Sequence, residues 1–278
     1  MSDRPPPSKR GPSRQADRPA RPRFKKPTLR LFTTTLWEYP SQHYESDGGT
    51  QGDPNYAGAT PSWVIWQLLQ RYTRENDLVV DPMCGSGTTI DVARDLNRRG
   101  LGYDLAPRRE DILKADARDL PLEDAKADFV FIDPPYSTHI DYSDSPRCIG
   151  KLDAGEQTVE DDGTPRTGAE YYEAMEEVIA ECERVLKNRR YMALYVSDSW
   201  KKRRGEKGGG GGQFMPIGFE LYSILRDYFG PIDIIAVVRH NQKLNRGNWH
   251  KAAEEQNFFL RGFNYLFIMK KVEARPAE

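Results

Sequence analysis

Residues 128–137 read DFVFIDPPYS, an apolar run that stops at a carboxylate and two prolines. The four apolar residues 129–132 predict a strand buried on both faces. Because neither proline can donate a ladder hydrogen bond, the strand must end at Asp133. The carboxyl ends of strands in an open parallel sheet line the ligand crevice, so Asp133 and Tyr136 are expected at its rim. Taken alone, the motif is equally compatible with a plain end of a strand.

A second motif lies upstream, at residues 81–89 (DPMCGSGTT), directly after the short apolar strand Leu78–Val80. A helix is predicted after the glycines, to about Asn97. Gly85 and Gly87 permit a tight turn and a close approach of the backbone to a ligand at the start of that helix. The third glycine of a dinucleotide fingerprint and the lysine of a phosphate-binding loop are both missing. An ATPase loop and an ordinary NAD site are therefore disfavoured.

Four successive predicted strands end in aspartate, at Asp81, Asp104, Asp116 and Asp133. A single aspartate at a strand end is usually a cap or turn residue, but four along one sheet edge are hard to assign to turns. Asp104 follows the glycine turn at a distance where an acidic group can bind a ribose diol. The sequence thus predicts a ligand with a ribose along this edge.

The two motifs together resemble those of the class I, S-adenosylmethionine-dependent amino-methyltransferases, specifically the DNA N6-adenine and N4-cytosine methylases. Residues 81–89 resemble the cofactor motif of that family and residues 133–136 its catalytic motif, in the order of the group without circular permutation. The resemblance covers the chain from about residue 56 to its end. Residues 56–61 loosely resemble the most N-terminal motif of the family, which closes over the methionine end of the cofactor.

The resemblance implies S-adenosylmethionine as the cofactor and assigns roles to residues of both motifs. Asp81 and Gly85 would line its methionine part, Asp104 its ribose and Asp116 its adenine. The residues implied to bind the cofactor are Asp81, Pro82, Cys84, Gly85, Ser86, Gly87, Thr88, Asp104, Asp116 and Ala117. The residues implied in catalysis are Asp133, Pro134, Pro135 and Tyr136.

The implied reaction is direct methyl transfer to an exocyclic amine of a base in DNA, without a metal or a covalent intermediate. N6 of adenine is favoured because the catalytic motif begins with Asp, whereas Ser is more typical of the N4-cytosine enzymes. An RNA base methyltransferase could use the same motif. A non-catalytic binding module would not need an intact motif. A partner in restriction–modification is left open by the sequence.

The rest of the chain fits a doubly wound α/β fold, with a seven-stranded, mostly parallel sheet and an antiparallel last strand. Thr60 and Pro61 are expected as N-cap and first-turn residue of a helix that runs through Arg74. Apolar residues at helical spacing predict a further helix ending near Lys187. The remaining predicted elements are a helix at Ile217–Phe229 and strands at Tyr191–Val196, Ile232–Val238 and Phe263–Met269.

Residues 31–278 are predicted to form a single catalytic domain in which no segment is long enough for a separate target-recognition domain. Recognition would then depend on loops after strand ends, at 137–166, 198–216 and 241–261. The second loop contains four successive Lys or Arg residues, 201–204, and it is read either as a flexible surface loop or as a basic flap over a polynucleotide backbone. For His139, a solvent-facing loop residue is favoured over a catalytic base.

The charge is distributed unevenly, although the net charge is only −1. Residues 1–30 carry ten Lys or Arg against two Asp, so the tail has a balance of +8 and the remainder about −9. This proline-rich tail is predicted to be disordered, and it acts either as a solubilising leader or as an arm that touches phosphates.

Composition excludes several other classes of protein. No apolar run reaches the 18 residues of a membrane span, and no apolar stretch follows the N-terminal charges as in a secretory signal. The three cysteines form no CxxC pair, and together with four histidines they show no zinc-ligand spacing. We therefore expect a cytoplasmic protein without a structural metal.

Overall fold

The computed structural model describes residues 26–202, 212–240, 247–255 and 257–272. Most of the basic tail, the glycine run after Lys202 and residues 241–246 lie outside the described residues. Within the described part, no helix is long and apolar enough to cross a membrane.

The described residues form one large sheet, five α-helices and two small hairpins. The strands of the large sheet are β1 (Leu36–Trp37), β2 (Leu78–Asp81), β3 (Arg99–Asp104), β4 (Ile112–Lys114), β5 (Ala127–Ile132), β8 (Leu186–Val196), β11 (Gly230–Val238) and β12 (Phe263–Lys270). The helices are α1 (Ser62–Tyr72), α2 (Thr88–Asp95), α3 (Ala169–Val185), α4 (Ile217–Tyr228) and α5 (Gly247–Glu255). The hairpins pair β6 (Gln157–Val159) with β7 (Pro165–Thr167) and β9 (Ser199–Lys202) with β10 (Gly212–Met215).

The large sheet has the strand order β1-β11-β12-β8-β5-β2-β3-β4. Strand β12 is antiparallel to both of its neighbours, whereas the other pairs are parallel. The doubly wound, mostly parallel sheet with an antiparallel last strand is thereby confirmed, and a two-residue strand, β1, extends it beside β11. The chain winds outward in opposite directions from the adjacent strands β2 and β5. Ligands bind at such a switch point, beyond the carboxyl ends of the strands.

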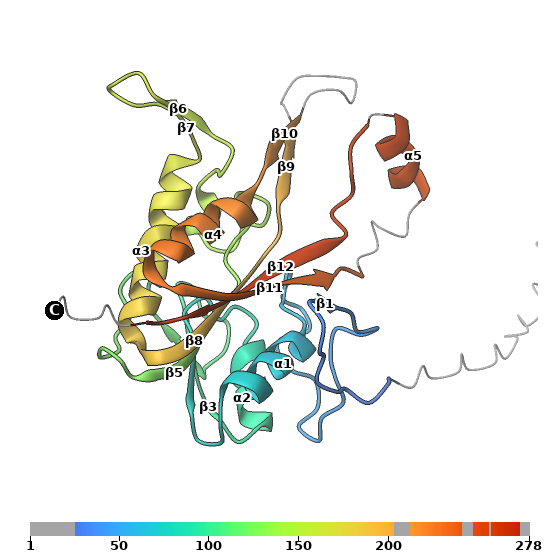
Figure 1. Ribbon diagram of the computed structural model, residues 1–278, viewed down its shortest axis with the longest axis vertical. Coiled ribbons are helices and arrows are strands. Elements are labelled where there is room, and N and C mark those ends of the chain that lie inside the picture. Colours follow the sequence, from blue (N-terminus) through green and yellow to red (C-terminus); the bar gives the residue numbers. More distant parts are fainter. Residues whose placement is uncertain (1–25, 203–211, 241–246, 256, 273–278) are drawn as a thin grey trace, which may run out of the picture.

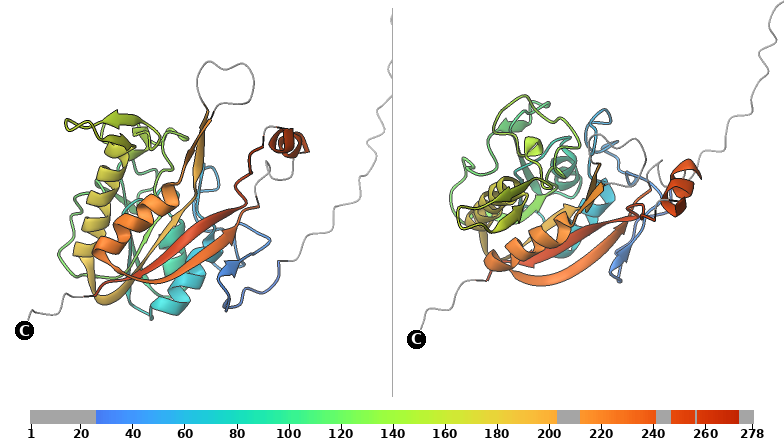
Figure 2. Two further views of the ribbon diagram at one scale, coloured as in Figure 1. Left: turned by 45° about the horizontal axis from the view of Figure 1, so that its top comes forward. Right: turned by 90° about the horizontal axis from the view of Figure 1, so that it is seen from above.

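Helices cover both faces of the sheet (Figures 1 and 2). Helix α1 packs Trp63 and Ile65 into a core on one face, and helix α3 packs Tyr171 and Met175 into the core on the other. Strand β5 is buried along its whole length, as its apolar run predicts. The strand ends at Ile132, directly before Asp133 and the two prolines that cannot donate a ladder hydrogen bond.

The three predicted recognition loops leave the carboxyl ends of β5, β8 and β11, and they contain more regular structure than a loop reading implies. The β6–β7 hairpin, the β9–β10 hairpin and helix α5 all project from the same end of the molecule in Figure 1. Strand β8 also begins earlier than predicted, at Leu186, directly after helix α3. The chain therefore presents three extensions around the predicted ligand edge.

Candidate active site

The four predicted aspartates lie along a single edge of the sheet. Asp81 and Asp104 end β2 and β3, Asp116 follows β4, and Asp133 directly follows β5. Three neighbouring cavities open along this edge. The first is lined by Pro82, Asp104, Asp116, Ala117, Asp133 and Pro135 among others. The second is lined by Asp81, the glycine turn, Tyr136 and Arg239, and the third by Trp63, Tyr136, Tyr195, Arg239 and Asn264.

Asp133 lies where the three cavities meet, since its side chain lines each of them. Its Oδ1 accepts a hydrogen bond of 2.7 Å from the Tyr136 hydroxyl, and its Oδ2 accepts one from the Thr60 hydroxyl. Burial raises the pKa of Asp133 to about 7, although both hydrogen bonds and the positive charge of Arg239 act in the opposite direction. The Asp133 carboxylate is therefore a half-buried hydrogen-bond acceptor that faces all three cavities.

Thr60 does not cap helix α1 as predicted. The N-cap position belongs to Pro61, without a side-chain capping bond, and the Thr60 hydroxyl points instead to Asp133. The two residues are 73 positions apart in the chain. A threonine before a proline at a helix start is a common capping pattern, so the sequence gives no signal for this contact.

The backbone of the catalytic motif is fixed by hydrogen bonds from helix α3 and from the loop that follows. The Tyr171 hydroxyl donates to the Pro135 carbonyl at 2.7 Å. Ser137, with a φ of 63°, adopts the left-handed conformation that is uncommon for a residue with a side chain. Its hydroxyl accepts the Ala154 N–H at 3.1 Å, which stabilises this turn. Such conformations concentrate at functional sites.

The glycine turn after β2 is held by the carboxylates at the ends of β2 and β3. Asp81 Oδ2 accepts the Thr89 hydroxyl at 2.5 Å, and Asp104 Oδ2 accepts the Gly85 N–H at 3.0 Å. Burial raises the pKa of Asp81 to about 7. At Gly85 a Cβ would lie 2.8 Å from the Tyr56 ring, and the φ of 47° also favours glycine. The turn therefore needs glycine because an aromatic ring packs directly against its backbone.

Asp116 is paired with two arginines at the far end of the first cavity. Arg118 lies 2.8 Å and Arg147 2.9 Å from its Oδ2. Burial by itself would raise the pKa of Asp116, but these partners outweigh it and hold the pKa below its ordinary value. Arg147 comes from the segment after the catalytic motif, so this segment closes one end of the cavity.

The structure places most of the predicted site residues around the first two cavities. Pro82, Asp104, Asp116 and Ala117 line the first, and Asp81, Cys84, Gly85, Ser86 and Thr88 line the second. Gly87 and Pro134 line neither. Gly87 is the N-cap residue of helix α2, with a φ of 81°, and Pro134 is buried. Burial raises the pKa of Cys84 well above its ordinary range, so its thiol is uncharged.

Tyr142 and Arg239 line the site but belong to neither sequence motif, and Tyr56 had no role of its own assigned within residues 56–61. Tyr56 and Tyr142 line both the first and the second cavity, with ring centroids 6.4 Å apart. Arg239 follows the carboxyl end of β11, donates to the Ser197 hydroxyl at 3.1 Å and lines the second and third cavities. Its place after a predicted strand was the available signal, but it stood outside both motifs. His139 is exposed, lines the second cavity and hydrogen-bonds to Ser199.

The raised pKa of Asp133 predicts a pH-dependent stability. A carboxyl whose folded-state pKa is raised from 3.8 to about 7 stabilises the fold fully below pH 3.8, and this contribution is lost progressively as the pH rises from 3.8 to about 7. One pKa unit corresponds to about 1.4 kcal/mol, so the full effect is at most roughly 4 kcal/mol. Because Asn has no charge to bury, Asp133→Asn should unfold at a higher temperature than the wild type at pH 8, by several degrees more than at pH 5.

Thermal unfolding of both proteins at the two pH values measures this difference. Asp81 is present in both proteins, but the charge of Asp133 helps to raise the pKa of Asp81, so the comparison reports the loss of the Asp133 charge together with its effect on Asp81. A melting-temperature difference that is the same at pH 5 and pH 8 would contradict the burial of a charge at Asp133.

Strand order, a glycine turn after the first strand of the doubly wound sheet and an acidic carboxyl edge define a class I S-adenosylmethionine-dependent methyltransferase. The chain belongs to the DNA methylase family (N6_N4_Mtase), whose model matches residues 6–115 and 127–275. This family comprises N6-adenine and N4-cytosine methylases, and its cofactor is S-adenosylmethionine. The resemblance drawn from the two motifs is thereby confirmed. The first cavity offers two carboxylates, Asp104 and Asp116, which suit the ribose diol and the adenine amine of that cofactor.

Individual proteins match this chain over shorter stretches or at lower identity. The type II methyltransferase M2.LlaDCHI of Lactococcus lactis subsp. cremoris is 41% identical over 44 residues, and the match spans 16% of either chain. A methyltransferase from Methanosarcina mazei superposes with a TM-score of 0.43 at 13% identity over 74% of this chain and 98% of its own. TrmN from Thermus thermophilus gives a TM-score of 0.46 at 16% identity over 78% of this chain and 50% of its own.

Proposed function

We propose that this chain transfers a methyl group from S-adenosylmethionine to N6 of adenine in DNA, with Asp133 as the acceptor of the amine hydrogen bond. The observation that carries the proposal is the position of Asp133, whose carboxylate is shared by the first cavity and by the two cavities beyond it. A methyl donor on one side and a base on the other can meet only at such a residue. The short likeness to a type II methyltransferase agrees with a role in restriction–modification.

The chemistry requires help because the lone pair of an exocyclic amine is delocalised into the ring. The Asp133 carboxylate accepts a hydrogen bond from one N–H of the amine and directs the lone pair toward the methyl group. The family resemblance assigns the second N–H to the carbonyl of Pro134, a residue that lines none of the three cavities. The same acceptors stabilise the positive charge that grows on nitrogen in the transition state. Holding the amine and the methyl group in line supplies further acceleration.

Tyr136 has two tasks in this proposal. Its hydroxyl donates to Asp133 and accepts the amide of Asn264 at 3.5 Å, which fixes the ring beside the second and third cavities. The ring then offers a stacking surface for a base that has left the double helix. Burial raises the pKa of the Tyr136 hydroxyl well above its ordinary range, so the hydroxyl stays protonated.

Aromatic and arginine side chains on the projecting elements support a nucleic-acid substrate. Trp200 and Phe214 face each other across the β9–β10 hairpin and are 43% and 42% exposed. The guanidinium of Arg261 lies 4.9 Å from the centre of the Phe214 ring. Trp200 and Arg261 also line the second cavity. Exposed aromatics with an adjacent arginine suit unstacked bases and phosphates.

The decisive experiment measures methyl transfer from radiolabelled S-adenosylmethionine to unmethylated duplex DNA, single-stranded DNA and RNA, followed by nucleoside analysis. We expect label in N6-methyldeoxyadenosine. Label in N4-methyldeoxycytidine would replace adenine by cytosine as the target, and label confined to RNA would overturn the DNA substrate.

The Thr60 hydroxyl gives a test of the acceptor role that leaves Asp133 in place. Thr60→Val removes a donor from the carboxylate, and a hydrogen bond to a charged group contributes about 1.5–3 kcal/mol, so transfer should slow by roughly 10- to 150-fold. Loss of this donor also raises the pKa of Asp133, because the hydrogen bond favours the ionised form. The acid limb of the pH–rate profile should therefore move to higher pH.

Thr60→Ser keeps the hydroxyl and is the matched control, with a rate and pH profile close to the wild type. If Thr60→Val lowers the rate without moving the acid limb, the hydroxyl does not act through Asp133.

A further inference from the structure

Residues 44–60 form a strap that crosses from helix α2 over the glycine turn to the catalytic carboxylate. Its base is closed where the Ser62 N–H donates to the Gln42 carbonyl at 3.0 Å and the Gln42 amide donates to the Ala59 carbonyl at 2.8 Å. Near its end, Thr60 contacts Asp133. The strap thus carries two site residues, Tyr56 and Thr60, on a segment without helix or strand.

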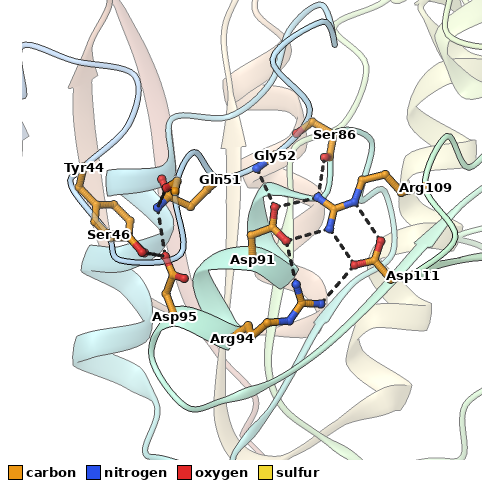
Figure 3. Close-up of polar contacts among 11 residues, drawn as sticks. Tyr44, Ser46, Gln51, Gly52, Ser86, Asp91, Arg94, Asp95, Arg109 and Asp111 are labelled. Carbon is orange, nitrogen blue, oxygen red and sulfur yellow. Dashed lines mark hydrogen bonds and ion pairs between the residues drawn. The ribbon is translucent and has the colours of Figure 1, made fainter.

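A carboxylate on the last turn of helix α2 holds the first half of the strap. Asp95 Oδ2 accepts hydrogen bonds from the Tyr44 hydroxyl at 2.8 Å, the Ser46 hydroxyl at 2.6 Å and the Gln51 amide at 3.0 Å (Figure 3). Both Tyr44 and Gln51 are buried. Three donors on one charged oxygen make this contact stronger than neutral hydrogen bonds of the same number.

A second carboxylate, one helical turn earlier, holds the strap where it meets the glycine turn. Asp91 Oδ2 accepts the Gly52 N–H at 2.8 Å, and the next residue, Asp53, donates its N–H to the Ser86 carbonyl at 2.9 Å. A Cβ at Gly52 would lie 2.5 Å from the Thr88 hydroxyl, and its φ of 78° also favours glycine. The strap therefore lies directly on the turn that opens helix α2.

Asp91 itself is fixed by an arginine that also reaches the turn. Arg109 contacts the two oxygens of Asp91 at 2.7 and 2.8 Å and donates to the Ser86 carbonyl at 3.2 Å. Arg109 and Arg94 both contact Asp111, which completes the cluster in Figure 3. The ion pair with Arg109 keeps the Asp91 carboxylate at a defined position for the strap.

We propose that Asp91 and Asp95 are positioning residues for cofactor binding, which act by docking the strap so that Tyr56 forms a wall of the cofactor cavity. Neither carboxylate lines any of the three cavities at the sheet edge, so they act through the strap. Tyr56 packs on Gly85, and Arg108 lies 5.2 Å from the centre of its ring. The proposal rests on the cofactor site assigned above.

The fraction of molecules in which the strap is docked determines how much the affinity for the cofactor changes. When only a fraction of molecules is competent to bind, the apparent dissociation constant rises by the inverse of that fraction. If Asp95→Ala leaves about a tenth of the molecules with a docked strap, affinity for the cofactor falls about tenfold. Methyl transfer at saturating cofactor should fall less, because bound cofactor restores the docked strap.

The experiment measures the affinity of S-adenosylhomocysteine by calorimetry for the full chain and its variants, well below their melting temperatures. Asp95→Ala and Tyr44→Phe remove the two sides of the same contact, so both should weaken binding, and the double variant should be no weaker than Asp95→Ala. Hydrogen exchange at residues 47–58 should become faster in each variant and recover when the ligand is saturating.

Asp124→Asn is the control, because it removes a carboxylate whose ion-pair partner is Arg184 and which contacts no strap residue and lines none of the three cavities. Its affinity should stay near that of the wild type. Equal affinity in the wild type, Asp95→Ala and Tyr44→Phe would overturn the proposal. A wild-type protein that does not bind S-adenosylhomocysteine would instead contradict the cofactor site itself.

Discussion

Asp133→Ala should abolish nearly all methyl transfer while leaving cofactor binding close to that of the wild type. The carboxylate acts chiefly where positive charge develops on the amine, and removal of one such preorganised group costs roughly 10²- to 10³-fold in rate. An interaction made mainly in the transition state changes kcat and leaves ground-state binding nearly intact. Single-turnover transfer at pH 8, where the carboxylate is ionised, and calorimetry with S-adenosylhomocysteine measure the two quantities.

Asp128→Asn is a control on the same strand. Asp128 lies at the opposite end of β5, contacts Lys187 and Arg190, and lines none of the three cavities. Its variant should transfer methyl groups at a rate near the wild type at temperatures where it is folded. Unchanged turnover in Asp133→Ala would remove Asp133 from the mechanism.

Asp104→Ala should weaken cofactor binding by roughly 10- to 150-fold, which corresponds to the 1.5–3 kcal/mol of a hydrogen bond to a charged group. Asp104 Oδ1 accepts the Ala106 N–H at 2.8 Å and its Oδ2 accepts the Gly85 N–H. These two bonds aim the carboxylate into the first cavity, where a ribose diol would donate to its remaining lone pairs. Calorimetry of the wild type and the variant gives the difference directly.

A ribose-modified ligand separates this contact from a collapse of the glycine turn. The wild type should bind S-adenosylhomocysteine much more tightly than its 2′-deoxy analogue, and Asp104→Ala should bind the two almost equally. If the variant still distinguishes the two ligands as strongly as the wild type, the ribose lies elsewhere.

Local chemistry explains why the fold class was accessible from the sequence. The apolar run before Asp133 is long enough for a strand and is followed by prolines, so its end could be located to the residue. Gly85 and Gly87 likewise mark the turn between strand β2 and helix α2. Each of these signals depends on residues that are neighbours in the chain, and four strand ends in register placed the aspartates on one edge.

The predicted ends of elements failed where a distant part of the chain competed. Thr60 has the sequence signature of an N-cap, but a buried carboxylate is a better partner for its hydroxyl than a helix start that Pro61 already occupies. The resemblance assigned Asp116 to the adenine of the cofactor, and nothing in the local sequence predicted its ion pair with Arg147, which lies beyond the catalytic motif. Such contacts follow from packing of side chains and leave no local pattern.

The sequence by itself therefore determined the doubly wound sheet, the glycine turn, the acidic edge and the resemblance to DNA amino-methyltransferases. Only the tertiary structure decided which side chains surround Asp133, that the strap docks on Asp91 and Asp95, and that Tyr56 packs on Gly85. The physical reason is how far apart in the sequence the interacting residues lie. Backbone conformation and burial patterns arise from residues close in sequence, whereas the partners of a buried polar group are chosen by the three-dimensional packing of the whole chain.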